Sequence, residues 1–586
     1  MNPEIPPRKP VRKAKAKVKS GCRTCKIRKV KCDEHFPICH RCHSTGRVCD
    51  GYGVWGGGGN HYWLRPSSDG PRDILDFPSL ARISTPATSM DEKASFDWFR
   101  GRTIVKLPGS YLSDFWTTIL LQASQSEQAV WHATMALSFT HRGGFVDIGS
   151  DPANKLEQST LRHCIKAVRH LHPHFSARDK ASSRVVLIVC LVFVVLDLLR
   201  GHFTSAQIHL RNGLHILAET QPPSLQTPPE SLDNSIAEAF FRLNTQVELL
   251  QHHHHHPRPC ILPPPLQPPI PNQFRSYTAA WHSLDNLMKQ VIHLSAQARE
   301  LHPPNPESTL LSTHQQQILT ALNAWITTYT TSLPTLQLSI SQTIAEAKAK
   351  VHRLVCGYYI MLTIMTETCL LQPDNETVFD THTHSFNDLI NTLSELWTLT
   401  INHPDHSTIP SSSPSLSLNP LAQEHAQTPR GSTPRRIGEG CDMSHTIIDI
   451  GWMPPLFFTA TKCRDRHIRR SAIRLLESTN HREGIWDAKI TACIARRVME
   501  IEEGDFFDGA DGDCDGDDFF GGDGESGDQS IDIPVLLPES CRIRDLEVRL
   551  EGDPLERVVL FGGWEGISGG KRVCIGEYDV VEQRWL

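Results

Sequence analysis

The sequence predicts a mainly α-helical protein, in which a small two-zinc, six-cysteine module precedes a large all-α domain with disordered linkers. Three observations predict this fold class. Near the N-terminus, six cysteines repeat one spacing. Beyond about residue 90, apolar residues recur at helical intervals, and stretches rich in Pro, Ser and His interrupt them. At 586 residues, the chain is also too long for one ordinary domain.

The charge is distributed unevenly along the chain. Residues 1–50 hold fourteen Lys and Arg against four Asp and Glu, a balance of +10, whereas the whole chain has a formal net charge of −6. The remainder therefore carries −16. A basic head on an acidic body indicates that only the head is built to meet a polyanion such as double-stranded DNA.

Export and membrane insertion are both disfavoured. Residues 1–20 are basic and Pro-rich and contain no apolar stretch typical of a signal peptide, so we expect a reducing compartment and reduced cysteines. The most apolar run, residues 185–196, is followed by Asp197 and is shorter than the ~20 residues that a bilayer span needs. We expect a buried helix there and no membrane partner.

The cysteines near the N-terminus contain the half C-x2-C-x6-C twice. A C-x2-C pair brings two thiolates to one tetrahedral zinc, and three ligands per half leave each ion one ligand short. Sharing one cysteine from each half completes both ions. So short a segment buries little apolar surface, so zinc must supply much of its folding free energy. The predicted ligands of the two Zn²⁺ ions are Cys22, Cys25, Cys32, Cys39, Cys42 and Cys49.

Other metal or disulfide arrangements fit the sequence less well. A disulfide framework requires export. Two independent zinc ribbons need four ligands each, and each half has three. A run of five histidines at residues 252–256 has no framework for a closed metal site.

The cysteine segment resembles the fungal zinc binuclear cluster regulators, through the run GCRTCKIRKVKCDE and the proline Pro37 between the halves. The resemblance implies that Cys22 and Cys39 bridge both zinc ions. Cys25 and Cys32 would then complete one ion, and Cys42 and Cys49 the other.

The same resemblance implies how the head would read DNA. Family modules of this kind set a helix end into the major groove, often at CGG triplets. By position, Arg28 and Lys29 become the expected base readers, because donation to guanine O6 and N7 is the commonest specific contact. Arg23, Lys26 and Lys31 are expected to hold phosphates, which fixes register without reading sequence. A solvated surface charge is the alternative for each of them.

The segments on either side of the module have different compositions. Residues 1–20 form a basic tail suited to nuclear import, to phosphate contacts or to both. Residues 51–90 are a Gly-rich linker with no a/d repeat, so no coiled coil follows the cluster. The head would bind as a monomer, or a self or hetero dimer would form through the body.

The body is predicted as one helical regulatory domain over residues 91–500, with linkers at 251–272 (Pro/His-rich) and 404–436 (Ser/Pro-rich). Helical periodicity covers residues 113–142, 155–171, 183–199 and 206–217. The stretch VFVVLDLLRGHFTSAQIHLRNGLHIL and residues 451–500 resemble the helical middle region of the same regulators, which implies an all-α regulatory domain.

Residues 501–530 form an acidic segment, and residues 531–586 would complete the regulatory domain. From residue 500 to 528 there are thirteen acidic residues and no basic one, with four phenylalanines among them. Such a composition is typical of activation segments that dock into coactivators, and a solvated loop is the alternative. The last residues contain strand-like stretches such as 557–561.

No catalytic site is predicted. The glycines at 51, 53 and 56 match a dinucleotide fingerprint but follow a zinc module instead of a strand. Zinc ions saturated by thiolates leave no open position for a substrate. The sequence therefore predicts a nuclear, sequence-specific regulator of RNA polymerase II genes that is not an enzyme. The alternatives are an interaction scaffold with a structural zinc module and, more remotely, an enzyme.

Overall fold

The computed structural model describes two parts of the chain. In the head it describes residues 25, 28, 30–33 and 40–45. In the body it describes residues 89–109, 113–145, 150–177, 179–220, 232–251, 269–300, 308–338, 342–371, 375–401, 446–507, 536–564 and 572–586. The predicted basic tail, all but the last residues of the Gly-rich linker, the Ser/Pro-rich linker and most of the Pro/His-rich linker and acidic segment lie outside these residues.

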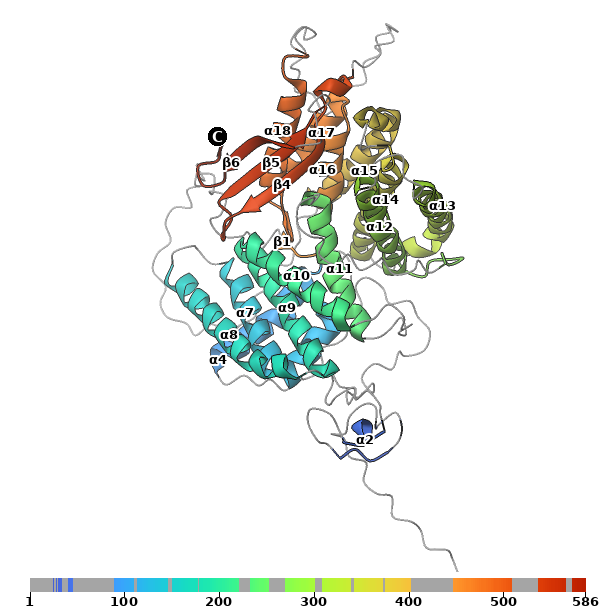
Figure 1. Ribbon diagram of the computed structural model, residues 1–586. Helices are drawn as coiled ribbons and strands as arrows, with labels where there is room; N and C mark the ends of the chain where they lie inside the picture. Colours follow the sequence, from blue (N-terminus) through green and yellow to red (C-terminus); the bar gives the residue numbers. More distant parts are fainter. Residues whose placement is uncertain are drawn as a thin grey trace, which may run out of the picture.

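The first half of the body is a layered group of helices (Figure 1). It contains α4 (Met90–Trp98), η2 (Phe99–Thr103), α5 (Ile104–Lys106), η3 (Phe115–Ile119), α6 (Leu120–Ser126), α7 (Gln128–Gly143), α8 (Asp151–Ser176), α9 (Lys180–Arg200), α10 (Phe203–Thr220) and α11 (Leu232–Gln251). The helices expected over residues 155–171, 183–199 and 206–217 are confirmed within α8, α9 and α10.

The single helix predicted over residues 113–142 is wrong in one respect, because the chain breaks at Glu127. This residue is extended, with φ −121° and ψ 116°. Ser124 donates its hydroxyl to the carbonyl of Leu121 at 2.8 Å, and Ser126 donates to that of Gln122 at 3.4 Å. Such side-chain bonds compete with the helical ladder, so α6 ends at Ser126 and α7 starts at Gln128.

Helix α9 holds the most apolar run and lies in the core. It begins where the Asp179 carboxylate accepts the amides of Ala181 and Ser182, both at 3.0 Å. It ends at Gly201, whose φ of +76° favours glycine. Its length and composition would suit a membrane span, but 78% of its most apolar window is buried inside the protein. The prediction of a buried helix is confirmed.

The second half of the body adds helices and two sheets. Its helices are α12 (Tyr277–Glu300), α13 (Ser308–Gln337), α14 (Gln342–Thr368), η4 (Glu376–His382), α15 (Thr383–Ile401), α16 (Met453–Lys462), α17 (Arg466–Glu477), α18 (Ala488–Glu503) and η6 (Glu539–Cys541). In the small sheet, β1 (Thr446–Ile447) pairs parallel with β2 (Arg482–Glu483), which pairs antiparallel with β3 (Trp486–Asp487). Helix α11 connects the two halves and contacts α9, α12 and α16.

The chain ends in a four-stranded antiparallel sheet, in the order β4 (Arg544–Glu551), β5 (Arg557–Gly563), β6 (Val573–Asp579) and β7 (Arg584–Trp585). The strand-like stretch at residues 557–561 is confirmed within β5. Strand β4 contacts α10 and α11. Leu555, in the β4–β5 turn, donates its amide to the carbonyl of Gly201 at 3.0 Å. Buried residues from Phe96 to Val580 therefore form one continuous core in a mainly α-helical body.

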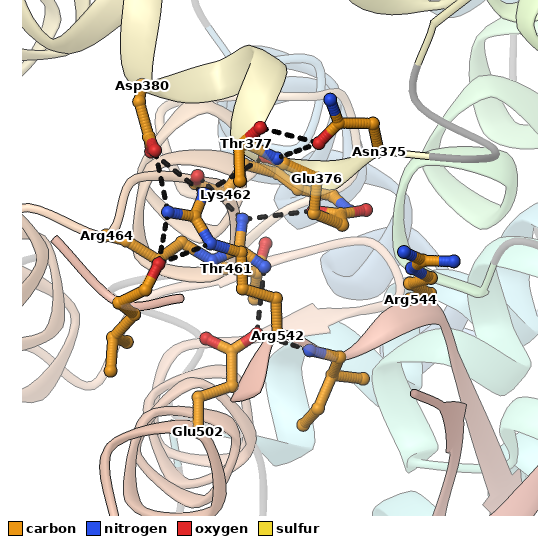
Figure 2. Close-up of polar contacts among 12 residues, drawn as sticks. Asn375, Glu376, Thr377, Asp380, Thr461, Lys462, Arg464, Glu502, Arg542 and Arg544 are labelled. Atoms are coloured by element: carbon orange, nitrogen blue, oxygen red, sulfur yellow. Dashed lines mark hydrogen bonds and ion pairs between the residues drawn. The ribbon is translucent and has the colours of Figure 1, made fainter. Parts of the chain in front are cut away.

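A buried ionic network, shown in Figure 2, joins the start of the predicted acidic segment, and the chain that follows the segment, to the body. Glu376 on η4 accepts Lys462 at 2.7 Å and Arg464 at 3.1 Å. Arg464 also donates to Glu502, at 2.8 Å, and the same carboxylate oxygen accepts the amide of Ile543 at 2.8 Å. The start of the predicted acidic segment thus belongs to the fold, because Glu502 is a buried counter-ion and not a solvated charge.

Beyond the acidic segment, Arg542 completes this network. It reaches Asp380 on η4 through two nitrogens, at 2.8 and 2.6 Å, and it is 1% exposed. Two parallel N–H···O bonds of this kind fix both the guanidinium and the carboxylate. Because Glu502 precedes residues 508–535 and Arg542 follows them, the network holds the chain in place before and after that stretch.

Candidate nucleic-acid interface

Three of the six predicted zinc ligands are among the described residues, and they converge. Cys25, Cys32 and Cys42 are 0%, 6% and 0% exposed and form one small buried cluster with Val30 packed against it. The Sγ atoms of Cys25 and Cys42 lie 3.9 Å apart, although the residues belong to different halves. Cys22, Cys39 and Cys49 lie outside the described residues.

This geometry fits a thiolate-bound metal. With Zn–S bonds of about 2.3 Å, two ligands of one tetrahedral zinc lie about 3.8 Å apart. Buried sulfurs from both halves at such a spacing are the donor set that zinc prefers. How the six cysteines divide between two ions remains the prediction drawn from the resemblance. Among the described residues, no group of three or more His, Cys, Asp or Glu is placed to hold a metal ion, and this includes Cys25, Cys32 and Cys42.

An aspartate orders the second half of the module. Helix α2 (His40–His43) begins directly after the inter-half loop. The Asp33 carboxylate, beside Cys32, accepts the amides of His40 at 3.1 Å and Arg41 at 2.8 Å. The first amides of a helix generally have no acceptor within the helix, and a carboxylate also suits the positive end of the helix dipole. Asp33 thus ties the first half to the second.

The two described basic residues of the predicted DNA-contacting set have different surroundings. Lys31 is exposed. Arg28 is half-buried, and its guanidinium donates to the Thr45 hydroxyl at 3.4 Å. Thr45 in turn donates to the carbonyl of Arg41 at 2.8 Å. Arg23, Lys26 and Lys29 lie outside the described residues.

The sequence reasoning did not single out Asp33 or Thr45. Both act through hydrogen bonds to groups seven or more residues away, except for the bond from Thr45 to its own helix. The signal that could have identified Asp33 is an acidic residue directly after the third cysteine of a basic run. Thr45 carries no comparable signal.

Comparison with protein families identifies both parts of the chain. Residues 20–54 match the fungal Zn(2)-Cys(6) binuclear cluster domain, and residues 102–423 match the fungal specific transcription factor domain. The chain belongs to the fungal-specific transcription factor family. Members of this family are DNA-binding transcription regulators and not enzymes, and the cluster domain implies zinc. The predicted family, fold class and broad function are thereby confirmed.

Individual relatives agree with this assignment. The chain is 25% identical over 560 residues to the aspercryptin biosynthesis cluster-specific transcription regulator atnN of Emericella nidulans, covering 83% of this chain and 87% of the relative. It is 28% identical over 178 residues to the Zn(2)-C6 fungal-type transcription factor afumD of Aspergillus fumigatus, covering 28% of this chain and 44% of that relative. No solved structure matches the chain.

Proposed function

We propose that this family member is a nuclear regulator of RNA polymerase II genes, which it selects through CGG-containing DNA elements. The observation that carries the proposal is the convergence of buried cysteines from both halves of the basic head, with Cys25 and Cys42 at 3.9 Å. A thiolate cluster held in this way presents the surrounding cations on a rigid support. The −16 balance of the remaining chain supports a single DNA-facing surface at the head.

The six cysteines Cys22, Cys25, Cys32, Cys39, Cys42 and Cys49 hold two Zn²⁺ ions in this proposal. Bound zinc supplies folding free energy to a module too small to fold on apolar burial alone. It has no catalytic role, because four thiolates per ion leave no open coordination position.

The basic residues divide into base readers and phosphate contacts. Arg28 and Lys29 donate to guanine O6 and N7, and Arg23, Lys26 and Lys31 neutralise phosphates. The exposure of Lys31 supports a phosphate role, because a long cation on the surface reaches the backbone without reordering the module. The Thr45 hydroxyl holds the Arg28 guanidinium before DNA arrives, so less side-chain freedom is lost on binding.

The test is fluorescence anisotropy of the full-length zinc-loaded protein on labelled duplexes at ~150 mM salt, since DNA affinity depends on ionic strength. Duplexes carrying CGG are compared with scrambled duplexes, with and without a zinc chelator. We expect preference for CGG that the chelator abolishes. Zinc-dependent binding without preference would reject the CGG element, and no binding at all would favour the scaffold alternative.

Two lysine substitutions separate base reading from phosphate binding. Lys29→Ala should relax discrimination at one base position by about 1–3 kcal/mol. Lys31→Ala should weaken all duplexes alike and lower the salt slope by about 1. Lys93→Ala is the matched control, because Lys93 is an exposed cation on α4 of the body. An equal loss of discrimination from both head substitutions would contradict the division of roles.

Coactivators and a dimer partner are the further partners in this proposal. Acidic residues around Phe519 and Phe520 support docking of the acidic segment into a coactivator groove. The absence of an a/d repeat in the linker supports pairing of a self or hetero dimer through the body.

Similarity to the cluster-specific regulator atnN along most of the chain supports a biosynthetic gene cluster as the target. Genome-wide occupancy of the tagged full-length protein tests this, because scattered peaks outside any such cluster would reject it.

A further inference from the structure

Helix α8 packs one face against the body and turns a second, apolar face away from it. Its inner face buries Thr160, His163, Ala167 and Leu171 against α7 and α9. Its outer face exposes four large apolar side chains. Leu161, Ile165, Val168 and Phe175 are 46%, 70%, 52% and 61% exposed. In Figure 1, α8 lies at the edge of the first helical group, with α7 and α9 on its inner side.

The exposed side chains follow the spacing of a coiled-coil seam. Leu161, Ile165, Val168, His172 and Phe175 are separated by four, three, four and three residues. This is the alternation of the a and d positions of a heptad, which meet a second helix along one line. From Leu161 to Phe175 the seam is about 21 Å long, which corresponds to roughly four turns.

A row of cations flanks the seam. Lys155, Arg162 and Arg169 are spaced by seven residues, so all three occupy the position next to the seam that faces the partner helix. All three are exposed, and among the described residues none forms an ion pair. On the other flank, Glu157 is already paired with Arg200. The outer face of α8 is therefore apolar and cationic.

This charge pattern disfavours a second copy of the chain as the occupant. Two antiparallel α8 helices would bring the three cations of each against those of the other. Two parallel helices would bring the cations against Glu157, Cys164 and Leu171. Of these, Glu157 is already paired with Arg200, and Leu171 is buried, at 7% exposed. Neither orientation supplies free carboxylates, and like charges across a helix pair are destabilising.

We propose that the outer face of α8 is a docking surface for a helix of a partner protein with an apolar a/d seam flanked by Glu or Asp. The acidic segment of this chain is a poorer match for a helical partner, because residues 508–535 contain seven glycines, each unfavourable in a helix. An acidic helix satisfies both features of α8 together, since it covers the apolar seam and neutralises the cationic row.

The experiment measures the anisotropy of two labelled synthetic helices of about four heptads with the full-length protein. Both have Leu at a and d; one has Glu at e and g, and the other has Lys. Repulsion between glutamates keeps the acidic peptide from pairing with itself. We expect the acidic peptide to bind, and the Lys peptide to bind at least about tenfold more weakly.

Variants of α8 assign the binding to this face. The double variant R162E/R169E should reverse the preference and bind the Lys peptide, whereas K93E on α4 should leave it unchanged. Ile165→Glu should abolish binding of the acidic peptide without lowering the unfolding temperature, because Ile165 is 70% exposed. Phe175→Ser provides a second apolar variant should Ile165→Glu fold poorly.

Several results would overturn the proposal. Equal binding of both peptides would mean that the cationic row has no role, and binding of neither would mean that the face takes no helix. A dimer in sedimentation velocity that Ile165→Glu dissociates would make a second copy the occupant. Two competitors test other occupants: a synthetic peptide of residues 508–535, and vesicles with a quarter anionic lipid. If either displaced the labelled acidic peptide more strongly than the unlabelled acidic peptide does, that competitor would be the occupant.

Discussion

At the residue scale, Glu502 is the side chain on which the buried network depends most. It is 2% exposed and accepts Arg464, Arg469 and the amide of Ile543. Burial alone would raise its pKa, but the guanidinium groups of Arg464 and Arg469 outweigh burial and lower the pKa from 4.5 to about 2. The Glu502 charge therefore stabilises the fold at neutral pH.

Glu502→Gln should lower the free energy of unfolding by about 3–5 kcal/mol at pH 7, because it leaves buried guanidinium charges uncompensated. The folded pKa lies below the ordinary value, so this contribution is present above pH 4.5 and is lost as pH falls towards 2. The difference between wild type and variant in urea titrations should therefore shrink over that window. Glu500→Gln, at a half-exposed position on α18, is the control and should change stability by less than about 0.5 kcal/mol. Equal losses from both variants would contradict this account.

Asp33 has a comparable role in the head. Asp33→Ala removes the acceptor for the His40 and Arg41 amides, which should cost about 1 kcal/mol of module stability. Because folding and zinc binding are coupled, the apparent zinc affinity should fall about fivefold. Competition with a chromophoric chelator measures this on the full-length protein. Ser44→Ala, on the exposed end of the same module, should leave the affinity unchanged.

At the scale of elements, the crossing of α9, α10 and α11 depends on a glycine. A Cβ at Gly213 would lie 2.1 Å from a ring carbon of Phe240 and 3.1 Å from the sulfur of Cys190. Gly213→Ala should therefore destabilise the body by about 1–3 kcal/mol through overpacking. Gly101→Ala is the control, because a Cβ there meets nothing within 4 Å, and it should be neutral or slightly stabilising. The midpoint of thermal unfolding is measured for both variants. Equal midpoints would mean that Phe240 moves aside without cost, which would contradict the prediction.

The elements that could be predicted from sequence are those with a local signal. The apolar run of α9 and the stripe of α10 show helical periodicity in consecutive residues, so both were found. The break at Glu127 depends on serine hydroxyls bonding back to carbonyls, which periodicity does not encode. The sheet that begins at Arg544 was visible only as a strand-like stretch, although each of its strands pairs with its neighbour in the chain.

The candidate site likewise has residues that could be predicted from a local pattern and residues that could not. The cysteine spacing supports the predicted set of zinc ligands because a metal site needs fixed residue types at short intervals. The two acceptors that position the head, Asp33 and Thr45, are polar residues whose partners are known only once the halves fold together. The buried role of Glu502 was hidden for a related reason, since it lies within an acidic composition and its partners Arg464 and Arg469 are more than thirty residues away.

At the scale of the whole molecule, the body should fold without residues 508–535. The network holds Glu502 before this stretch and Arg542 after it, so the two ends are fixed by the fold and not by the intervening residues. Replacing the stretch with a Gly/Ser sequence of the same length should shift the unfolding midpoint by no more than a few degrees. Reporter output should fall if the stretch activates transcription. An equally long replacement of residues 500–527 is the comparison, because it removes Glu502 and should unfold the body.

The order in which a ribosome makes the chain gives the terminal sheet a particular importance. The cysteine module leaves the ribosome long before Arg542 and the strands that follow it. A message cut short before codon 542 encodes the complete module but leaves Asp380 without its arginine and β4 absent from its place beside α11. Such a product carries the predicted DNA-facing module on an unfinished body, so we expect premature stop codons shortly before codon 542 to separate occupancy of a promoter from its control.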